Sequence, residues 1–132
     1  MAHILVVDDD PALRRALQRM LEAGGHEVLH AGNGWEAMRV WREQGADLVL
    51  LDIHMPVSDG IEALIQFQAL DPQLPVIMMS GGDQTGYLDL LGDASLLGAR
   101  MTMRKPFTQR EVLEAVARAL DKPENELRSG DA

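Results

Sequence analysis

Four mostly apolar runs in this sequence each end in polar residues that together could bind a metal ion and a phosphoryl group. The polar residues are Asp8 and Asp9 after the first run, then Asp52, Ser80 and Lys105 after the other three. Grouped carboxylates repel one another, and a hard dication relieves this repulsion, with Mg²⁺ the usual choice where phosphate takes part. A carboxylate can also attack phosphorus, while an ammonium and a hydroxyl can pair with the phosphoryl oxygens. The set therefore predicts Mg²⁺-assisted phosphoryl transfer to a carboxylate.

These residues can meet only if the four runs are parallel strands, because the carboxyl ends of parallel strands lie along one edge of a sheet. Apolar runs alternate along the chain with segments of helical periodicity, a pattern that indicates βαβ units. The sequence therefore predicts an α/β domain built on a parallel sheet. The five expected strands are residues 3–8, 26–31, 47–52, 75–80 and 100–104.

Five helices are expected, one after each strand. The first begins at Pro11, a residue suited to the first turn of a helix. Two others begin at capping pairs, in which a residue at the helix start is followed three positions later by a glutamate. These pairs are Asn33 with Glu36 and Thr108 with Glu111. The fourth helix is expected at residues 87–97, after a glycine-rich loop.

The periodicity of apolar residues also predicts which side chains face the core. In the third helix, which follows Gly60, the expected core residues are Ile61, Leu64, Ile65 and Leu70. In the second helix, Trp35 and Trp41 lie six positions apart and should not share a face. Trp41 is expected in the core and Trp35 on the surface.

The composition narrows the class of protein. With 132 residues and 46% hydrophobic content, the chain is long enough for one globular domain with a real core. Its net charge of -9 argues against direct binding of nucleic acid, which requires a surplus of basic residues. The start of the chain lacks the basic and long apolar segments of a signal peptide or membrane span, so we expect a cytoplasmic protein that does not bind membranes.

The motifs around the candidate residues resemble those of bacterial response-regulator receiver domains, of the single-domain CheY-like kind. The resemblance covers residues 3 to about 120. It implies a flavodoxin-like fold, in which a five-stranded parallel sheet of order 2-1-3-4-5 is flanked by five helices. We expect this domain to occupy residues 1–121 and residues 122–132 to form a polar tail. The motifs are Val7-Asp8-Asp9-Asp10 with Pro11, Leu51-Asp52-Ile53-His54-Met55-Pro56, Asp59-Gly60, Ser80-Gly81, Gly98-Ala99 and Lys105-Pro106-Phe107.

The resemblance assigns a role to each acidic residue. Asp52 matches the phosphoacceptor, which takes a phosphoryl group from a histidine kinase or a histidine phosphotransfer protein. Asp8 and Asp9 match the acidic pair that positions Mg²⁺. The backbone carbonyl of His54 is implied as a further metal ligand, so the imidazole of His54 need not bind the ion.

The resemblance also assigns roles to the other site residues and exposes one departure. Ser80 matches the hydroxyl that moves onto the phosphoryl group, and Lys105 matches the ammonium that pairs with it. The peptide bond before Pro106 is expected to be cis, as is usual in the family. Thr102 stands where the family has an aromatic residue that rotates when the hydroxyl moves, so the usual coupling of the two cannot operate here.

We therefore expect a stand-alone response regulator of a two-component phosphorelay, a phosphoacceptor that assists its own phosphorylation and dephosphorylation and is not otherwise an enzyme. The sequence continues into no output domain after its last helix, so we expect the readout to be a partner protein or onward transfer of the phosphoryl group. The resemblance implies that such a partner binds the face formed by helix 4, strand 5 and helix 5.

Two other functions fit parts of the pattern. Thr102 favours a receiver-like interaction domain whose fold persists without a working phosphorylation switch. A phosphatase or mutase with an aspartyl phosphate intermediate would also use Asp52, but such enzymes generally carry an aspartate two residues after the nucleophile. His54 occupies that position here, and the chain has no room for a cap domain.

Overall fold

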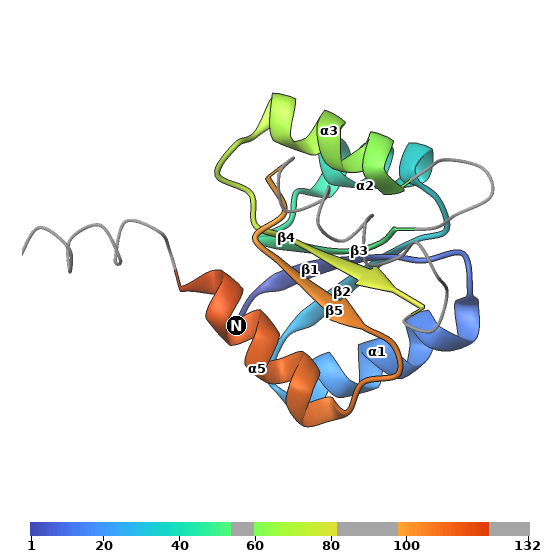
Figure 1. The fold of residues 1–132 in the computed structure, drawn as a ribbon, viewed down its shortest axis with the longest axis vertical. Helices are drawn as coiled ribbons and strands as arrows, with labels where there is room; N and C mark the ends of the chain where they lie inside the picture. The colour runs from blue at the N-terminus through green and yellow to red at the C-terminus, as the bar shows by residue number, and fades with distance from the viewer. Residues whose placement is uncertain (54–59, 82–97, 122–132) are drawn as a thin grey trace, which may run out of the picture.

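Five parallel strands form one sheet in the computed structural model, which describes residues 1–53, 60–81 and 98–121. Their order in the sheet is β2-β1-β3-β4-β5, so the order implied by the resemblance is confirmed (Figure 1). Every predicted strand is present, with ends that differ from the predicted ones by a residue or less. The strands are β1 (His3–Val7), β2 (Glu27–Ala31), β3 (Leu48–Asp52), β4 (Val76–Ser80) and β5 (Met101–Arg104).

Four helices lie within the described residues: α1 (Pro11–Ala23), α2 (Gly34–Gln44), α3 (Gly60–Leu70) and α5 (Gln109–Leu120). The predicted fourth helix at 87–97, His54 and the predicted tail at 122–132 lie outside the described residues. No helix in the described part of the chain is long and apolar enough to cross a membrane.

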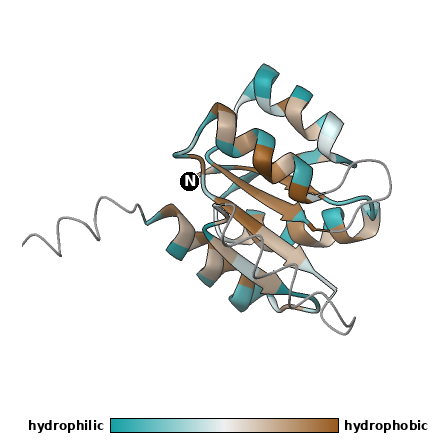
Figure 2. Ribbon diagram, turned by 45° about the horizontal axis from the view of Figure 1, so that its top comes forward, coloured by the Kyte–Doolittle hydropathy of each residue, from teal (hydrophilic) through white to brown (hydrophobic). Residues whose placement is uncertain are grey.

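The helices cover both faces of the sheet, with α2 and α3 on one side and α1 and α5 on the other (Figure 1). Alternate residues of each strand face opposite layers, as the geometry of a strand requires. In β1, Leu5 and Val7 pack with the α2 and α3 layer, whereas Ile4 and Val6 pack with the α1 and α5 layer. Strands covered on both faces should be nearly all apolar. Figure 2 shows hydrophobic strands between helices that carry both hydrophobic and hydrophilic residues.

The helix starts follow the capping predictions. Asp10 accepts hydrogen bonds from the first turn of α1, immediately before Pro11. Thr108 and Glu111 form the predicted capping box of α5, in which each side chain accepts from the other's backbone N–H. In α2, Asn33 caps the helix as predicted, but the Glu36 carboxylate accepts from the N–H of Gly32, one residue before the cap. The side chain of Glu36 thereby fixes the turn between β2 and α2.

The predicted core face of α3 was partly wrong. Ile65 and Leu70 are 49% and 52% exposed, while Ala63 and Phe67 are buried. This helix carries apolar residues around most of its circumference, so periodicity could not select the buried face. Trp35 is exposed as predicted, and Trp41 packs against the core with its ring edge-to-face on Phe67, at a centroid distance of 5.6 Å.

Candidate functional site

The candidate site lies at the carboxyl ends of four neighbouring strands. Asp52 and Ser80 are the last residues of β3 and β4, and Asp8 and Lys105 follow the last residues of β1 and β5. The strand register aligns these ends, with Val7 opposite Leu51. Further along the sheet, Asp52 lies opposite Met79 and Ser80 opposite Arg104. The fold therefore brings the four predicted positions to one edge of the sheet, as the sequence argument required.

Three carboxylates converge there. Asp8, Asp9 and Asp52 each offer one oxygen, and these oxygens lie within 4.8 Å of one another. Asp8 and Asp52 are buried, whereas Asp9 is exposed. A set of carboxylate oxygens with one side open to water suits Mg²⁺, a hard cation that prefers oxygen ligands and keeps several of its waters. The donor set therefore fits this ion.

Lys105 supplies a positive charge beside these carboxylates. Its Nζ donates to Asp8 Oδ2 at 2.8 Å and lies 3.6 Å from Asp52 Oδ1. Burial alone would lower the pKa of Lys105, but its hydrogen bond to Asp8 and the charges of Asp52 and Asp8 outweigh burial and raise the pKa. The ammonium is therefore charged at neutral pH. The peptide bond between Lys105 and Pro106 is cis, which confirms that prediction.

Ser80 contributes a buried hydroxyl. Its Oγ has no hydrogen-bond partner within the described part of the chain. The backbone of Ser80 does have a partner, because its carbonyl accepts a hydrogen bond from the N–H of Lys105 at 2.7 Å. An unpartnered buried hydroxyl is uncommon, because hydrogen bonds satisfy most buried polar atoms.

Two residues that the sequence argument did not assign to the site support it directly. The guanidinium of Arg14 donates through Nη1 to the backbone carbonyl of Asp8. Gly60, at the start of α3, lies so close to β3 that a Cβ placed on it would be 2.1 Å from the carbonyl oxygen of Asp52. The motif Asp59-Gly60 could have indicated that Gly60 belongs to the site. Nothing in the sequence pattern distinguished Arg14 from its neighbour Arg15.

Comparisons with known proteins agree with this fold and site. A family model described as the response regulator receiver domain matches residues 4–117. The chemotaxis protein CheY of Listeria monocytogenes is 40% identical over 120 residues, which span 90% of this chain and 98% of that protein. The sporulation initiation phosphotransferase F of Bacillus subtilis is 35% identical over 117 residues, 89% of this chain and 92% of that protein.

Solved structures show the same likeness. A response regulator receiver domain protein from Clostridium thermocellum superimposes with a TM-score of 0.85 at 31% identity, covering 96% of this chain and 98% of that one. A CheY-like receiver domain protein from Methanospirillum hungatei gives a TM-score of 0.83 at 31% identity, with the same coverage. The fold is thus of the flavodoxin-like receiver class. The chain belongs to the response regulator receiver domain family, whose members are signalling domains of two-component systems.

Proposed function

We propose that this domain accepts a phosphoryl group on Asp52 from a histidine kinase or a histidine phosphotransfer protein, and that phosphorylation switches its binding to a partner protein. The observation that carries this proposal is the convergence of three carboxylates with one ammonium at a single edge of the sheet. Such a cluster is costly for a fold to keep unless a cation binds there.

In the proposed reaction, a carboxylate oxygen of Asp52 forms a bond to phosphorus, and the bond between phosphorus and the donor histidine nitrogen breaks. The electron pair of that bond leaves with the imidazole. Asp8, Asp9 and Asp52 would hold Mg²⁺ together with the backbone carbonyl of His54. When bound, the ion offsets negative charge on the transferring oxygens.

Lys105 and Ser80 complete the proposed environment of the phosphoryl group. The ammonium of Lys105 lies 3.6 Å from Asp52 Oδ1, so it can pair with an oxygen of a phosphoryl group on that carboxylate. The hydroxyl of Ser80 has no partner among the described residues, and a phosphoryl oxygen would give it one. Both groups would therefore stabilise the phosphorylated form more than the free form.

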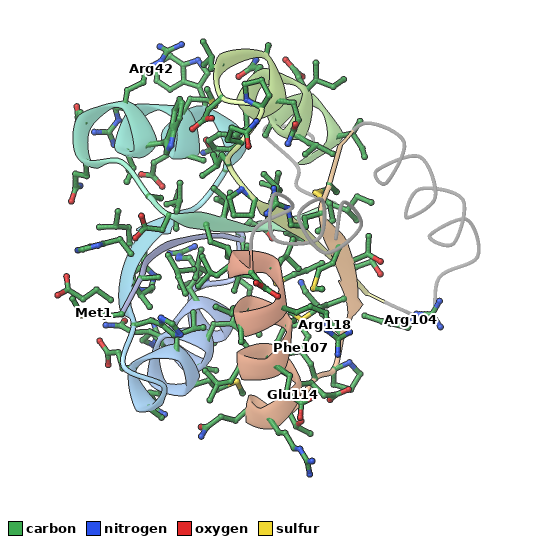
Figure 3. The ribbon with its side chains drawn as sticks, turned by 90° about the vertical axis from the view of Figure 1, so that its left-hand side faces the viewer. Met1, Arg42, Arg104, Phe107, Glu114 and Arg118 are labelled. Carbon is green, nitrogen blue, oxygen red and sulfur yellow. The ribbon has the colours of Figure 1, made fainter. Side chains whose placement is uncertain are left out.

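We further propose that a downstream partner binds the face formed by helix 4, β5 and α5. The described part of this face contains a groove of about 560 Å³ between β5 and α5. Figure 3 shows Glu114 and Arg118 on α5, Phe107 between β5 and α5, and Arg104 at the end of β5. Both apolar and charged side chains line the groove, as in many protein interfaces. We expect the partners to be cytoplasmic proteins, not nucleic acid or membranes.

A second function is supported by Thr102. This residue lies in β5 opposite Met78 and is only partly buried. Threonine cannot undergo the aromatic rotation that couples the switch hydroxyl to the partner face in the family. A receiver-like domain that binds its partner regardless of phosphorylation would therefore keep this fold and tolerate Thr102. The two functions differ in one observable, which is whether phosphorylation changes amide hydrogen exchange in β5 and α5.

The proposed phosphorylation is tested by the intact mass of the protein after incubation with a small phosphodonor and Mg²⁺. The expected result is a single phosphoryl adduct that is lost when the metal is removed by a chelator and when Asp52→Asn replaces the acceptor. Asp71→Asn, which changes a carboxylate outside the cluster, is the matched control and should keep the adduct. No adduct on the wild-type protein would refute the phosphoacceptor function and favour the phosphorylation-independent domain.

A further inference from the structure

Arg14 contacts the backbone of the acidic cluster and also lies close to the turn after β2. It belongs to the second turn of α1, and its Nη1 donates to the backbone carbonyl of Asp8. The same nitrogen lies beside the turn between β2 and α2, since a Cβ on Gly32 would be 3.6 Å from it. Its Nε is buried and has no hydrogen-bond partner within the described residues. The side chain of Arg14 is thus partly buried although none of the described carboxylates forms an ion pair with it.

The contact with Arg14 completes the hydrogen bonding of Asp8. The N–H of Asp8 donates to the carbonyl of Ala31 at 3.1 Å. Its carboxylate accepts from the N–H of Asp10 at 2.9 Å and from Lys105 at 2.8 Å. The carbonyl of Asp8 lies beyond the last paired residue of β1, so the ladder of the sheet does not hold it. Arg14 holds this carbonyl and thereby the peptide plane that joins Asp8 to Asp9.

We propose that Arg14 is a positioning residue for Mg²⁺: by holding the peptide between Asp8 and Asp9, it keeps both carboxylates aimed at the metal site. This inference rests on the proposed function, because it requires that the acidic cluster binds Mg²⁺. Groups that orient metal ligands without touching the metal typically change metal affinity about 10–100-fold when they are removed.

Electrostatics alone predicts the opposite effect, and this makes the inference testable. Arg14 carries a positive charge close to the site of a dication, so the charge by itself weakens Mg²⁺ binding. Removing the charge would therefore tighten binding if orientation played no part. A purely structural role of Arg14 would lower the stability of the fold and leave the affinity of the folded protein unchanged. Only a positioning role predicts weaker binding.

The test is the Mg²⁺ dissociation constant of the full chain, measured by isothermal titration calorimetry at a temperature where circular dichroism shows the protein folded. Arg14→Met removes the guanidinium and keeps the aliphatic stem. Arg15→Met makes the same change of charge at the next residue, which is exposed and has no hydrogen bond or ion pair with the described residues, and it serves as the matched control. We expect Arg14→Met to weaken binding about tenfold or more and Arg15→Met to leave it unchanged or slightly tighter.

Arg14→Lys provides a second variant that keeps the charge and loses the planar guanidinium. Since a lysine at this position has a different reach and only one nitrogen, we expect weaker Mg²⁺ binding here as well. This variant decides the question if Arg14→Met does not fold. Affinity within about twofold of wild type, or tighter, in the folded variants would overturn the inference while leaving the proposed function intact. No Mg²⁺ binding by the wild-type protein would overturn both.

Discussion

The ammonium of Lys105 donates a 2.8 Å hydrogen bond to Asp8 Oδ2, although 97 positions separate the two residues in the sequence. Asp8 is 1% exposed and Lys105 is partly buried, so the pair is largely removed from water. The Nζ of Lys105 also lies 3.6 Å from Asp52 Oδ1. The charge of Lys105 therefore offsets part of the repulsion among the three carboxylates at the edge of the sheet. This relationship has consequences for stability as well as for chemistry.

Replacing Lys105 by methionine should destabilise the fold. The change leaves the buried carboxylate of Asp8 without its charged partner, and we expect a loss of about 1–3 kcal/mol in the free energy of unfolding. Urea denaturation in the absence of Mg²⁺ measures this loss. Arg110→Met is the control, because Arg110 pairs with Glu114 on the exposed surface of α5 and should contribute less than about 0.5 kcal/mol. Equal losses in the two variants would show that Lys105 does not stabilise the fold through its pairing with buried Asp8.

Replacing Asp9 by asparagine should have the opposite effect on stability. Asp9 is exposed, and its charge adds to the repulsion from Asp8 and Asp52. Without Mg²⁺ we expect Asp9→Asn to raise the free energy of unfolding by about 0.5–1 kcal/mol, since it removes like-charge repulsion.

The same variant should lose the stabilisation that Mg²⁺ gives the wild-type protein. Binding of a ligand to the folded state alone raises the melting temperature as the ligand concentration increases. We therefore expect the melting temperature of the wild-type protein to rise with Mg²⁺ and that of Asp9→Asn to stay nearly constant. A lower stability of Asp9→Asn without metal, or an undiminished response to Mg²⁺, would show that Asp9 does not take part in the site.

Much of this site could be predicted because its signals are local in the sequence. The pattern of apolar runs that each end in a polar residue predicted that Asp8, Asp52 and Lys105 lie together, and their contacts confirm this. The predicted capping box of Thr108 and Glu111 likewise has its expected hydrogen bonds. Periodicity is sufficient for such features because each depends on residues within one turn or one strand.

The remaining features depend on which segments pack together, and periodicity does not encode that. Arg14 is one of several arginines on α1, and only the fold shows that its guanidinium reaches the carbonyl of Asp8. The exposure of Ile65 and the burial of Phe67 likewise depend on how α3 lies against α2 and the sheet. The structure brings the predicted carboxylates and Lys105 together, but the chemical roles assigned to them, to Ser80 and to the backbone of His54 remain predictions.

The close approach of Gly60 to β3 predicts a strong effect of alanine at that position. A Cβ would lie 2.1 Å from the carbonyl oxygen of Asp52 and 2.7 Å from Cα of Ile53, and both are backbone atoms that cannot rotate away. We expect Gly60→Ala to lower the free energy of unfolding by about 2 kcal/mol or more, because α3 must move off the end of β3.

Gly32→Ala is the matched control for this prediction. A Cβ on Gly32 would lie 3.5 Å from Glu36 Oε1 and 3.6 Å from Arg14 Nη1, which are ordinary contacts. We expect a change of less than about 1 kcal/mol for this variant. Chemical denaturation of both variants provides the comparison, and a similar small effect at Gly60 would mean that α3 is not held against Asp52 as described.

The lowered pKa values of His26 and His30 predict how the free energy of unfolding depends on pH. Burial, followed by the charge of the N-terminus, lowers the pKa of His26, and burial followed by the charges of Arg14 and Arg15 lowers that of His30. The unfolded chain, with a histidine pKa near 6.5, therefore binds protons more readily than the folded protein. Stability should fall as the pH is lowered through 6.5 towards the depressed pKa values of the folded state.

The double variant His26→Gln, His30→Gln should lose less stability over this range than the wild-type protein. Glutamine does not titrate, and it can keep a hydrogen bond with Gln18, the partner of His30. The free energy of unfolding, measured in urea about one pH unit above and below 6.5, gives the comparison. An identical pH dependence in both proteins would show that other groups cause it.

The claim that Asp52 is the phosphoacceptor is tested most directly by trapping the acyl phosphate. Borohydride reduces an aspartyl phosphate to homoserine, which tandem mass spectrometry locates in the sequence. After incubation with a small phosphodonor and Mg²⁺, we expect homoserine at position 52 and aspartate at positions 8 and 9. Homoserine at position 8 or 9, or no conversion in a protein that binds Mg²⁺, would contradict this claim.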